Sequence, residues 1–191
     1  MIPIGSRFCE STSKDADRVT TEVLCAPVHA ISRNLARAVS DRQDMEANAN
    51  MSMAALTAGL AFSNAILGAA HAMTHQVDGL IDQHHGETNA SILPHVMEFN
   101  LTASPERFRD IAVAMGEDVT GLDLLSAAEL SIRAVKRLIA DIGLEKGLAE
   151  IGLREEFIPL LSRNAMNDAC LVTNPRSATR EEIEAIFRKA M

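Results

Sequence analysis

Apolar residues recur along the chain at intervals of three and four residues, which is the spacing of one buried helix face. In the first such stretch, which begins after Asp15, the apolar positions are Leu24, Val28, Ile31, Leu35 and Val39. Pro27 lies inside this stretch, so we expect either a kink or a late helix start there.

A second helical stretch, from about Asp44 to Gly68, is rich in Ala and Gly and poor in charge. Small side chains let neighbouring backbones approach closely, so we expect a central helix surrounded by others. The charge-free segment 47–77 is long enough to span a bilayer. Its Ser, Thr, Asn and His residues, and its Ala and Gly in place of Leu and Ile, favour a buried helix in a soluble protein with no membrane contact.

Further helices are marked by their ends. Pro105 follows Ser104 as the first residue of a helix that ends at Gly116, and residues 91–100 predict a short helix. Two capping boxes mark helix starts, Ser126 with Glu129 and Thr179 with Glu182, and Gly143 ends the first of these helices. Residues 155–166 predict one more helix. We therefore expect an all-α fold of about seven to nine helices.

Composition narrows the class of protein. The 191 residues are 47% hydrophobic but contain six Phe and no Trp or Tyr, which favours one domain of packed helices. A net charge of −8 leaves no basic excess for nucleic acid. Three distant cysteines and the lack of an apolar signal segment favour the cytoplasm. There is also no glycine-rich phosphate loop.

Five of the six histidines lie close together in the sequence: His71, His75, His84, His85 and His95. On a helix, His71 and His75 project from one face, one turn apart, so both imidazoles can reach one point. A turn-like stretch containing Gly79 can bring His85 back to the first histidine. Neutral imidazole is a common nitrogen ligand of Zn(II) and Fe(II).

Spacing alone leaves two interpretations open: a metal site, or separate histidines that hydrogen bond in the core or at the surface. The pair His71 and His75 lacks the intervening Glu of zinc proteases, so hydrolysis is disfavoured. We expect His84 to face solvent or to support a ligand from outside, and His95 to pack or to cap a helix. Cys170 is expected to be a small buried hydrophobe.

Long motifs resemble the iron-containing (group III) alcohol dehydrogenases. They are Ala58-Gly59-Leu60-Ala61-Phe62-Ser63-Asn64-Ala65, Leu67-Gly68-Ala69-Ala70-His71-Ala72-Met73-Thr74-His75, His85-Gly86, Asn89-Ala90, Leu93-Pro94-His95-Val96, Phe99-Asn100, Asp168-Ala169-Cys170 and Thr173-Asn174-Pro175-Arg176. The resemblance covers essentially the whole chain. It implies that residues 1–191 form one helical, metal-binding domain, like the C-terminal half of these enzymes (dehydroquinate synthase-like), with no Rossmann-type domain.

The resemblance also implies roles for five residues. His71 and His85 match metal ligands, for Fe(II) or Zn(II), and His75 matches the histidine that assists proton movement. Phe62 and Cys170 match positions that line the substrate pocket beside the nicotinamide. The implied reaction oxidises a small alcohol to an aldehyde or ketone, with the metal as Lewis acid and NAD or NADP as hydride acceptor.

Other parts of the family pattern are missing from this sequence. Family members carry an N-terminal nucleotide-binding domain and two further ligands, an Asp and a His four residues apart. An alignment of the first residues places Pro3 and Arg7 at those two positions, and Arg7 cannot bind a cation. Asp15, Asp17 or His29 could substitute, although their spacing does not fit. We therefore expect a weakly held metal, and NAD or NADP only with a nucleotide-binding domain.

Two functions remain as alternatives. In the first, the chain is the metal-binding half of an alcohol dehydrogenase that works with a separate nucleotide-binding chain. In the second, it is a degenerate or truncated helical protein without catalysis that acts as a partner-binding module. Both predict an exposed apolar surface that binds another chain or a second copy.

Overall fold

The computed structural model describes the backbone of residues 18–191 and the side chains of residues 25–63 and 65–191. This part of the chain folds into eight α-helices and three short 3-10 helices, without a strand, which confirms the all-α prediction. The elements are α2 (Arg18–Ser40), α3 (Met45–Ala65), α4 (Ala69–Ile81), α5 (His85–Asn100), η1 (Leu101–Ala103), α6 (Pro105–Ala114), α7 (Leu124–Asp141), η2 (Glu155–Phe157), α8 (Ile158–Ala165), η3 (Ala169–Thr173) and α9 (Arg180–Ala190).

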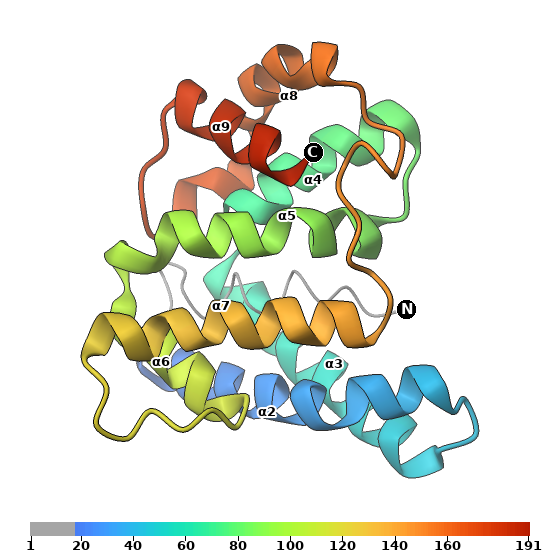
Figure 1. The fold of residues 1–191 in the computed structure, drawn as a ribbon, viewed down its shortest axis with the longest axis vertical. Coiled ribbons are helices and arrows are strands. Elements are labelled where there is room, and N and C mark those ends of the chain that lie inside the picture. Colours follow the sequence, from blue (N-terminus) through green and yellow to red (C-terminus); the bar gives the residue numbers. More distant parts are fainter. Residues whose placement is uncertain (1–17) are drawn as a thin grey trace.

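The helices pack in pairs that stack on one another (Figure 1). Helix α2 packs on α3, α6 on α7, α4 on α5, and α8 on α9. Helix α7 lies across the middle of the molecule, between the α2–α3 pair and α5, and α8 and α9 cover the far side of α4 and α5 (Figure 1). The buried apolar side chains form one core that runs through these layers.

The first predicted apolar stripe is largely confirmed. Val28, Ile31 and Leu35 are buried, Val39 at the end of α2 is 51% exposed, and the side chain of Leu24 lies outside the described residues. Of the two alternatives expected at Pro27, a kink or a late start, the late start is wrong, because α2 begins at Arg18 and continues through the proline.

The prediction that residues 44–68 form a helix surrounded by others is wrong in one respect. Helix α3 begins at Met45, close to the expected start, with Asp44 as its cap, and one stripe of small side chains, from Ala47 to Ala65, is buried. Its main contacts in the described structure are with α2 alone. The opposite flank exposes the large apolar side chains of Met53, Leu56 and Leu60, and Phe62 on another side of the helix and Ile66 just past its end are exposed as well. Helix α3 therefore lacks charged residues along most of its length although it is not buried on all sides, because its exposed flank is apolar.

The long charge-free stretch is broken where α3 ends. Ile66 adopts a left-handed φ of 56°, and Gly68 precedes the first residue of α4. None of the described helices has the length and apolar character that crossing a membrane requires.

The turn before His85 is shorter than predicted. Gly79 lies inside α4, and Asp82 ends this helix in the left-handed conformation. His84 then caps α5, because its Nδ1 accepts a hydrogen bond from the Gly86 backbone N–H at 3.2 Å. As a result, α5 begins at His85, six residues before the predicted start at Ser91.

The capping predictions have different outcomes. The Thr179 capping box is confirmed, because the side chains of Thr179 and Glu182 each accept a hydrogen bond from the other's backbone N–H. The Ser126 box is wrong: Asp123 is the cap of α7 and accepts from the Ser126 N–H. A carboxylate one turn earlier competes successfully for the same free N–H groups.

A buried amide pair joins three distant segments of the chain. The Asn174 side chain exchanges two hydrogen bonds with Asn100, of 2.8 and 3.0 Å, at the end of α5. Its oxygen also accepts from the backbone N–H of Ala69, the first residue of α4. Gly68 makes room for this contact, since a Cβ there would lie 3.1 Å from the Asn174 oxygen.

We predict that Asn174→Ala lowers the free energy of unfolding by about 2–4 kcal/mol, because it leaves the Ala69 N–H and the Asn100 amide buried without partners. Urea unfolding followed by circular dichroism measures this loss. Asn167→Ala is the matched control, since Asn167 is exposed, and it should change stability by less than about 0.5 kcal/mol. Equal losses in the two variants would contradict the role of Asn174.

Candidate functional site

Three of the clustered histidines meet at one place. His71 and His75 project from α4, and His85 is the first residue of α5. Their ring centroids are 5.9 Å (His71 to His75), 5.2 Å (His71 to His85) and 5.7 Å (His75 to His85) apart. The structure thus brings together the three histidines that the sequence analysis singled out.

His71 is the most buried of the three, with 3% of its surface exposed. Burial, reinforced by the neighbouring His85 and His75, lowers the pKa of His71 to about 3. The imidazole is therefore neutral at physiological pH, as a metal ligand must be. Its Nδ1 atom is buried and has no hydrogen-bond partner, so the fold leaves this nitrogen unused.

His85 is oriented by a carboxylate of α4. Its Nδ1 lies 2.7 Å from an oxygen of Asp78, and the Thr88 hydroxyl donates to the other oxygen of Asp78 at 2.6 Å. This interaction occupies Nδ1 and leaves Nε2 of His85 available. A carboxylate that holds the far nitrogen of an imidazole is the usual arrangement around a metal-bound histidine.

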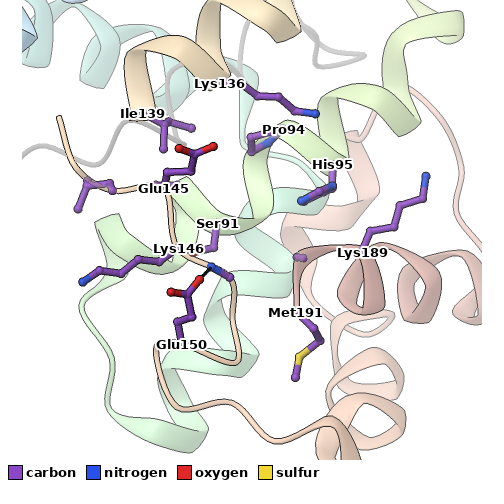
Figure 2. A pocket seen from close by; sticks show the side chains of 14 residues that line it. Ser91, Pro94, His95, Lys136, Ile139, Glu145, Lys146, Glu150, Lys189 and Met191 are labelled. Carbon is purple, nitrogen blue, oxygen red and sulfur yellow. Dashed lines mark hydrogen bonds between the residues drawn. The ribbon is translucent and has the colours of Figure 1, made fainter. Parts of the chain in front are cut away.

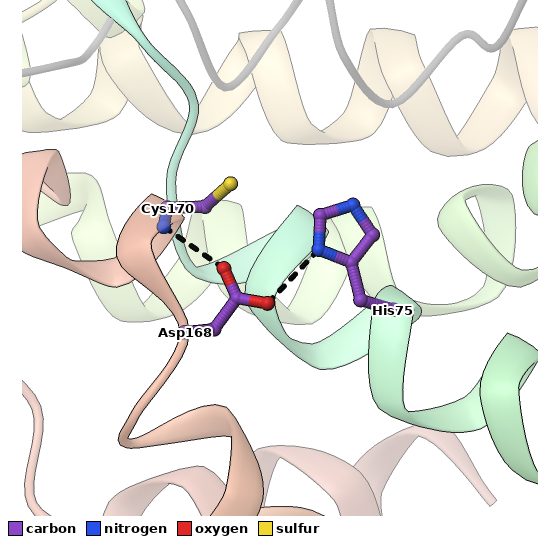
Figure 3. Close-up of side chains that lie close together, drawn as sticks. All are labelled: His75, Asp168 and Cys170. Carbon is purple, nitrogen blue, oxygen red and sulfur yellow. Dashed lines mark hydrogen bonds and ion pairs between the residues drawn. The ribbon is translucent and has the colours of Figure 1, made fainter.

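His75 is oriented by a carboxylate from a distant segment. Figure 3 shows that Asp168, in the loop between α8 and η3, faces the His75 ring, and its Oδ2 lies 3.0 Å from His75 Nδ1. The other oxygen of Asp168 accepts from the Cys170 backbone N–H at 2.9 Å. Partial burial raises the pKa of Asp168, but the hydrogen bonds from His75 and Cys170 outweigh it and lower the pKa below its ordinary value.

The donor atoms of His75, Asp168 and Cys170 all lie within 4.8 Å of one another, a spacing that a metal could also use. Two observations favour a hydrogen-bonded group instead. Both oxygens of Asp168 already accept hydrogen bonds. Burial, together with the Asp168 charge, raises the pKa of the Cys170 thiol to about 12, so the thiol stays protonated and is a poor ligand.

The pair His71 and His85 fits a divalent metal better. The first imidazole is buried and neutral with an unused nitrogen, and the second is held by Asp78 with Nε2 available. Neutral nitrogen donors with an outer carboxylate suit Fe(II) and Zn(II).

The remaining predicted residues lie around this cluster or away from it. Cys170 is half-buried beside Asp168, so it is less buried than expected. Phe62 lies near the end of α3 with 40% of its surface exposed, and the ring contacts that join the histidines do not include it. His84 is exposed and caps α5.

Most residues of the missing half of the metal site are not described. Pro3 and Arg7, at the two aligned ligand positions, and the possible substitutes Asp15 and Asp17 lie outside the described residues. His29 is exposed on α2 and its Nδ1 lies 3.0 Å from the carbonyl oxygen of Ala114 at the end of α6, so its expected role as a substitute ligand is not supported.

His95 lies in the wall of a separate hollow of about 340 Å³ (Figure 2). It is ten residues after His85 on α5, or roughly 15 Å along the helix axis. Burial lowers the pKa of His95. Lys136, Lys146 and Lys189 share this hollow with Glu145 and Glu150 among its lining residues. The hollow is therefore mixed in charge, and the packing role expected for His95 fits its position.

Sequence reasoning missed the two carboxylates that orient the histidines. Asp78 precedes His85 by seven residues, and the two residues lie on either side of the turn between α4 and α5. No sequence motif marks such a pair. Asp168 is 93 residues from His75. No local pattern connects positions so far apart.

Comparison with known proteins gives relatives of one family. Residues 10–191 match the model of the C-terminal part of the Fe-containing alcohol dehydrogenase family. The chain is 47% identical over 178 residues to the 1,3-propanediol dehydrogenase of Klebsiella pneumoniae, covering 93% of this chain and 46% of that protein. It is 41% identical over 179 residues to the NAD-dependent methanol dehydrogenase of Bacillus methanolicus, covering 94% and 47%.

Solved structures agree with this result. A 1,3-propanediol oxidoreductase superposes with a TM-score of 0.95 at 43% identity, over 98% of this chain and 50% of that chain. An alcohol dehydrogenase from Oenococcus oeni superposes with a TM-score of 0.94 at 38% identity, over 98% and 50%. The chain thus spans about half the length of the relatives it matches, and it belongs to the Fe-containing alcohol dehydrogenase family, whose C-terminal helical domain it represents.

Proposed function

We propose that this chain is the metal-binding half of an alcohol dehydrogenase that oxidises a small alcohol to an aldehyde or ketone, or catalyses the reverse reduction, with NAD or NADP. The observation that carries the proposal is the meeting of His71, His75 and His85 in a member of this family. The related proteins named above include an NAD-dependent methanol dehydrogenase, which fits a small alcohol as substrate.

His71 and His85 are the proposed ligands of Fe(II) or Zn(II). A divalent metal bound there would supply a Lewis acid for the substrate oxygen. The described ligand pair is incomplete, so we expect the chain alone to hold the metal weakly. His75 is the proposed proton acceptor for the alcohol, because its Nε2 is free while its Nδ1 is engaged. Phe62 and Cys170 are proposed to line the substrate pocket.

The nucleotide is proposed to come from a separate part of the enzyme, since the chain spans about half of its relatives. The exposed apolar flank of α3, which includes Met53, Leu56 and Leu60, is the surface proposed for this partner. A flank of large apolar side chains in water favours contact with another protein surface. Self-association through the same flank is the competing outcome. We propose the cytoplasm as the compartment of the enzyme.

Metal binding tests the assignment of the ligands. Zinc titration calorimetry should detect a site in the wild-type chain that His71→Ala and His85→Ala each abolish. Asp78→Ala, which releases His85, should weaken binding about 10- to 100-fold. His75→Ala and the matched control His84→Ala should leave binding unchanged. If His75→Ala removes the metal as completely as His71→Ala, then His75 is a ligand and its role in proton transfer is wrong.

The pH dependence of stability tests the neutral state of His71. Unfolded His71 binds a proton below its ordinary pKa of 6.5, but folded His71 does so only near 3. The stabilisation is therefore complete above pH 6.5 and is lost as the pH falls toward 3, by up to about 1.4 kcal/mol per pH unit. The free energy of unfolding can be measured as a function of pH by urea unfolding in the presence of a chelator. His71→Gln should lose the pH dependence that His71 contributes, whereas the exposed-site control His84→Gln should keep it. Parallel curves for wild type and His71→Gln would argue against a buried neutral His71.

Activity is tested in a chimera, because the chain matches only part of its relatives. The matched 178 residues would replace their counterpart in the 1,3-propanediol dehydrogenase of Klebsiella pneumoniae. We expect alcohol-dependent reduction of NAD or NADP, and a fall in kcat of about 10²- to 10⁴-fold for His75→Ala. The unmodified Klebsiella enzyme is the control. A folded, metal-loaded chimera without turnover would favour the non-catalytic partner-binding module.

A further inference from the structure

Asp168 is held in place from several sides. Its Oδ1 accepts from the Cys170 backbone N–H at 2.9 Å, and this bond caps η3. Its Oδ2 lies 3.0 Å from His75 Nδ1 and 3.3 Å from the amide nitrogen of Gln76. The Asp168 side chain is only 15% exposed. A carboxylate with this many fixed partners cannot turn away from His75 without losing several hydrogen bonds.

The contact determines which nitrogen of His75 carries the proton. An ionised carboxylate only accepts hydrogen bonds, so His75 Nδ1 must be the donor. In a neutral imidazole the other nitrogen is then an acceptor. Figure 3 shows this second nitrogen on the side of the ring away from Asp168. The geometry therefore presents a free basic nitrogen away from the segment that anchors the ring.

We propose that Asp168 is a positioning residue that fixes His75 in the Nδ1–H tautomer and aims Nε2 at the substrate oxygen. Only the effect of this tautomer on catalysis rests on the proposed function. The tautomer itself is a property of the chain and can be measured without turnover.

The proton path follows from this geometry. The alcohol O–H bond would break and its proton would move to His75 Nε2, and a nicotinamide held by the nucleotide-binding part of the enzyme would accept the hydride from the substrate carbon. The ring then carries two N–H groups and a positive charge, which the adjacent Asp168 carboxylate stabilises. The His75 side chain is 41% exposed, so the proton can pass from Nε2 to solvent and restore the neutral tautomer.

The two carboxylates that hold His85 and His75 come from different distances along the sequence. Asp78 and His85 lie at adjacent ends of α4 and α5, so their contact needs only the short turn between these helices. Asp168 reaches His75 from a loop 93 positions away in sequence. Docking of the loop between α8 and η3 therefore controls the acceptor nitrogen of His75.

Nitrogen NMR of the isolated chain tests the tautomer directly. With uniformly ¹⁵N-labelled protein above the titration range of histidine, His75 should show a protonated Nδ1 and an unprotonated Nε2. Asp168→Ala should shift the population to the Nε2–H form, while the neighbouring control Asn167→Ala should not. An unchanged Nδ1–H signal in Asp168→Ala, or an Nε2–H signal in the wild type, would overturn the proposal.

Kinetics of the chimera then test the consequence. Asp168→Ala should lower kcat at least about tenfold with little change in KM and with full metal content. Asp168→Asn, which keeps an acceptor oxygen without the charge, should lose less activity than the alanine variant and serves if that variant does not fold. Wild-type kcat in a folded Asp168→Asn or Asp168→Ala chimera would overturn the role of Asp168. An inactive wild-type chimera with the Nδ1–H tautomer intact would instead count against the proposed function alone.

Discussion

The buried hydrogen bonds between Asn100 and Asn174 hold together the segments from which the site is built. Asn100 ends α5, Asn174 follows η3, and the Asn174 oxygen also receives the first N–H of α4. Amide hydrogen bonds of this kind are strong in a low-dielectric interior and costly to leave unmade. Helix α4 carries His71 and His75, and α5 begins with His85, so this junction sets where the three imidazoles meet.

The three imidazoles differ because their surroundings differ. His71 is buried, which favours the neutral form, whereas His75 and His85 are partly exposed and each has a carboxylate on Nδ1. His71, which is buried, and His85, which Asp78 holds by Nδ1, are the rings proposed to bind a metal, and His75 is the ring proposed to exchange a proton. The same residue type thus supports two different chemical tasks within about 6 Å.

Helix α3 has a buried side of small residues and an exposed apolar flank. In the described structure the small side chains of α3 pack on α2, and its large ones face outward. Exposing large apolar side chains to water is unfavourable. This flank is the surface proposed above for contact with the nucleotide-binding part of the enzyme.

The sequence by itself determined most of the helices, the cap at Thr179, the family, and the clustering of His71, His75 and His85, because periodicity, capping and motifs are local properties of the chain. It misplaced the cap of α7, since Asp123 and Ser126 compete there for the same free N–H groups, and it placed the start of α5 six residues too late. Only the tertiary structure decided which flank of α3 is exposed and which carboxylates meet the histidines. Asp168 and Asn174 act on α4 across more than 90 residues, and contacts over such distances arise only when packing brings the segments together.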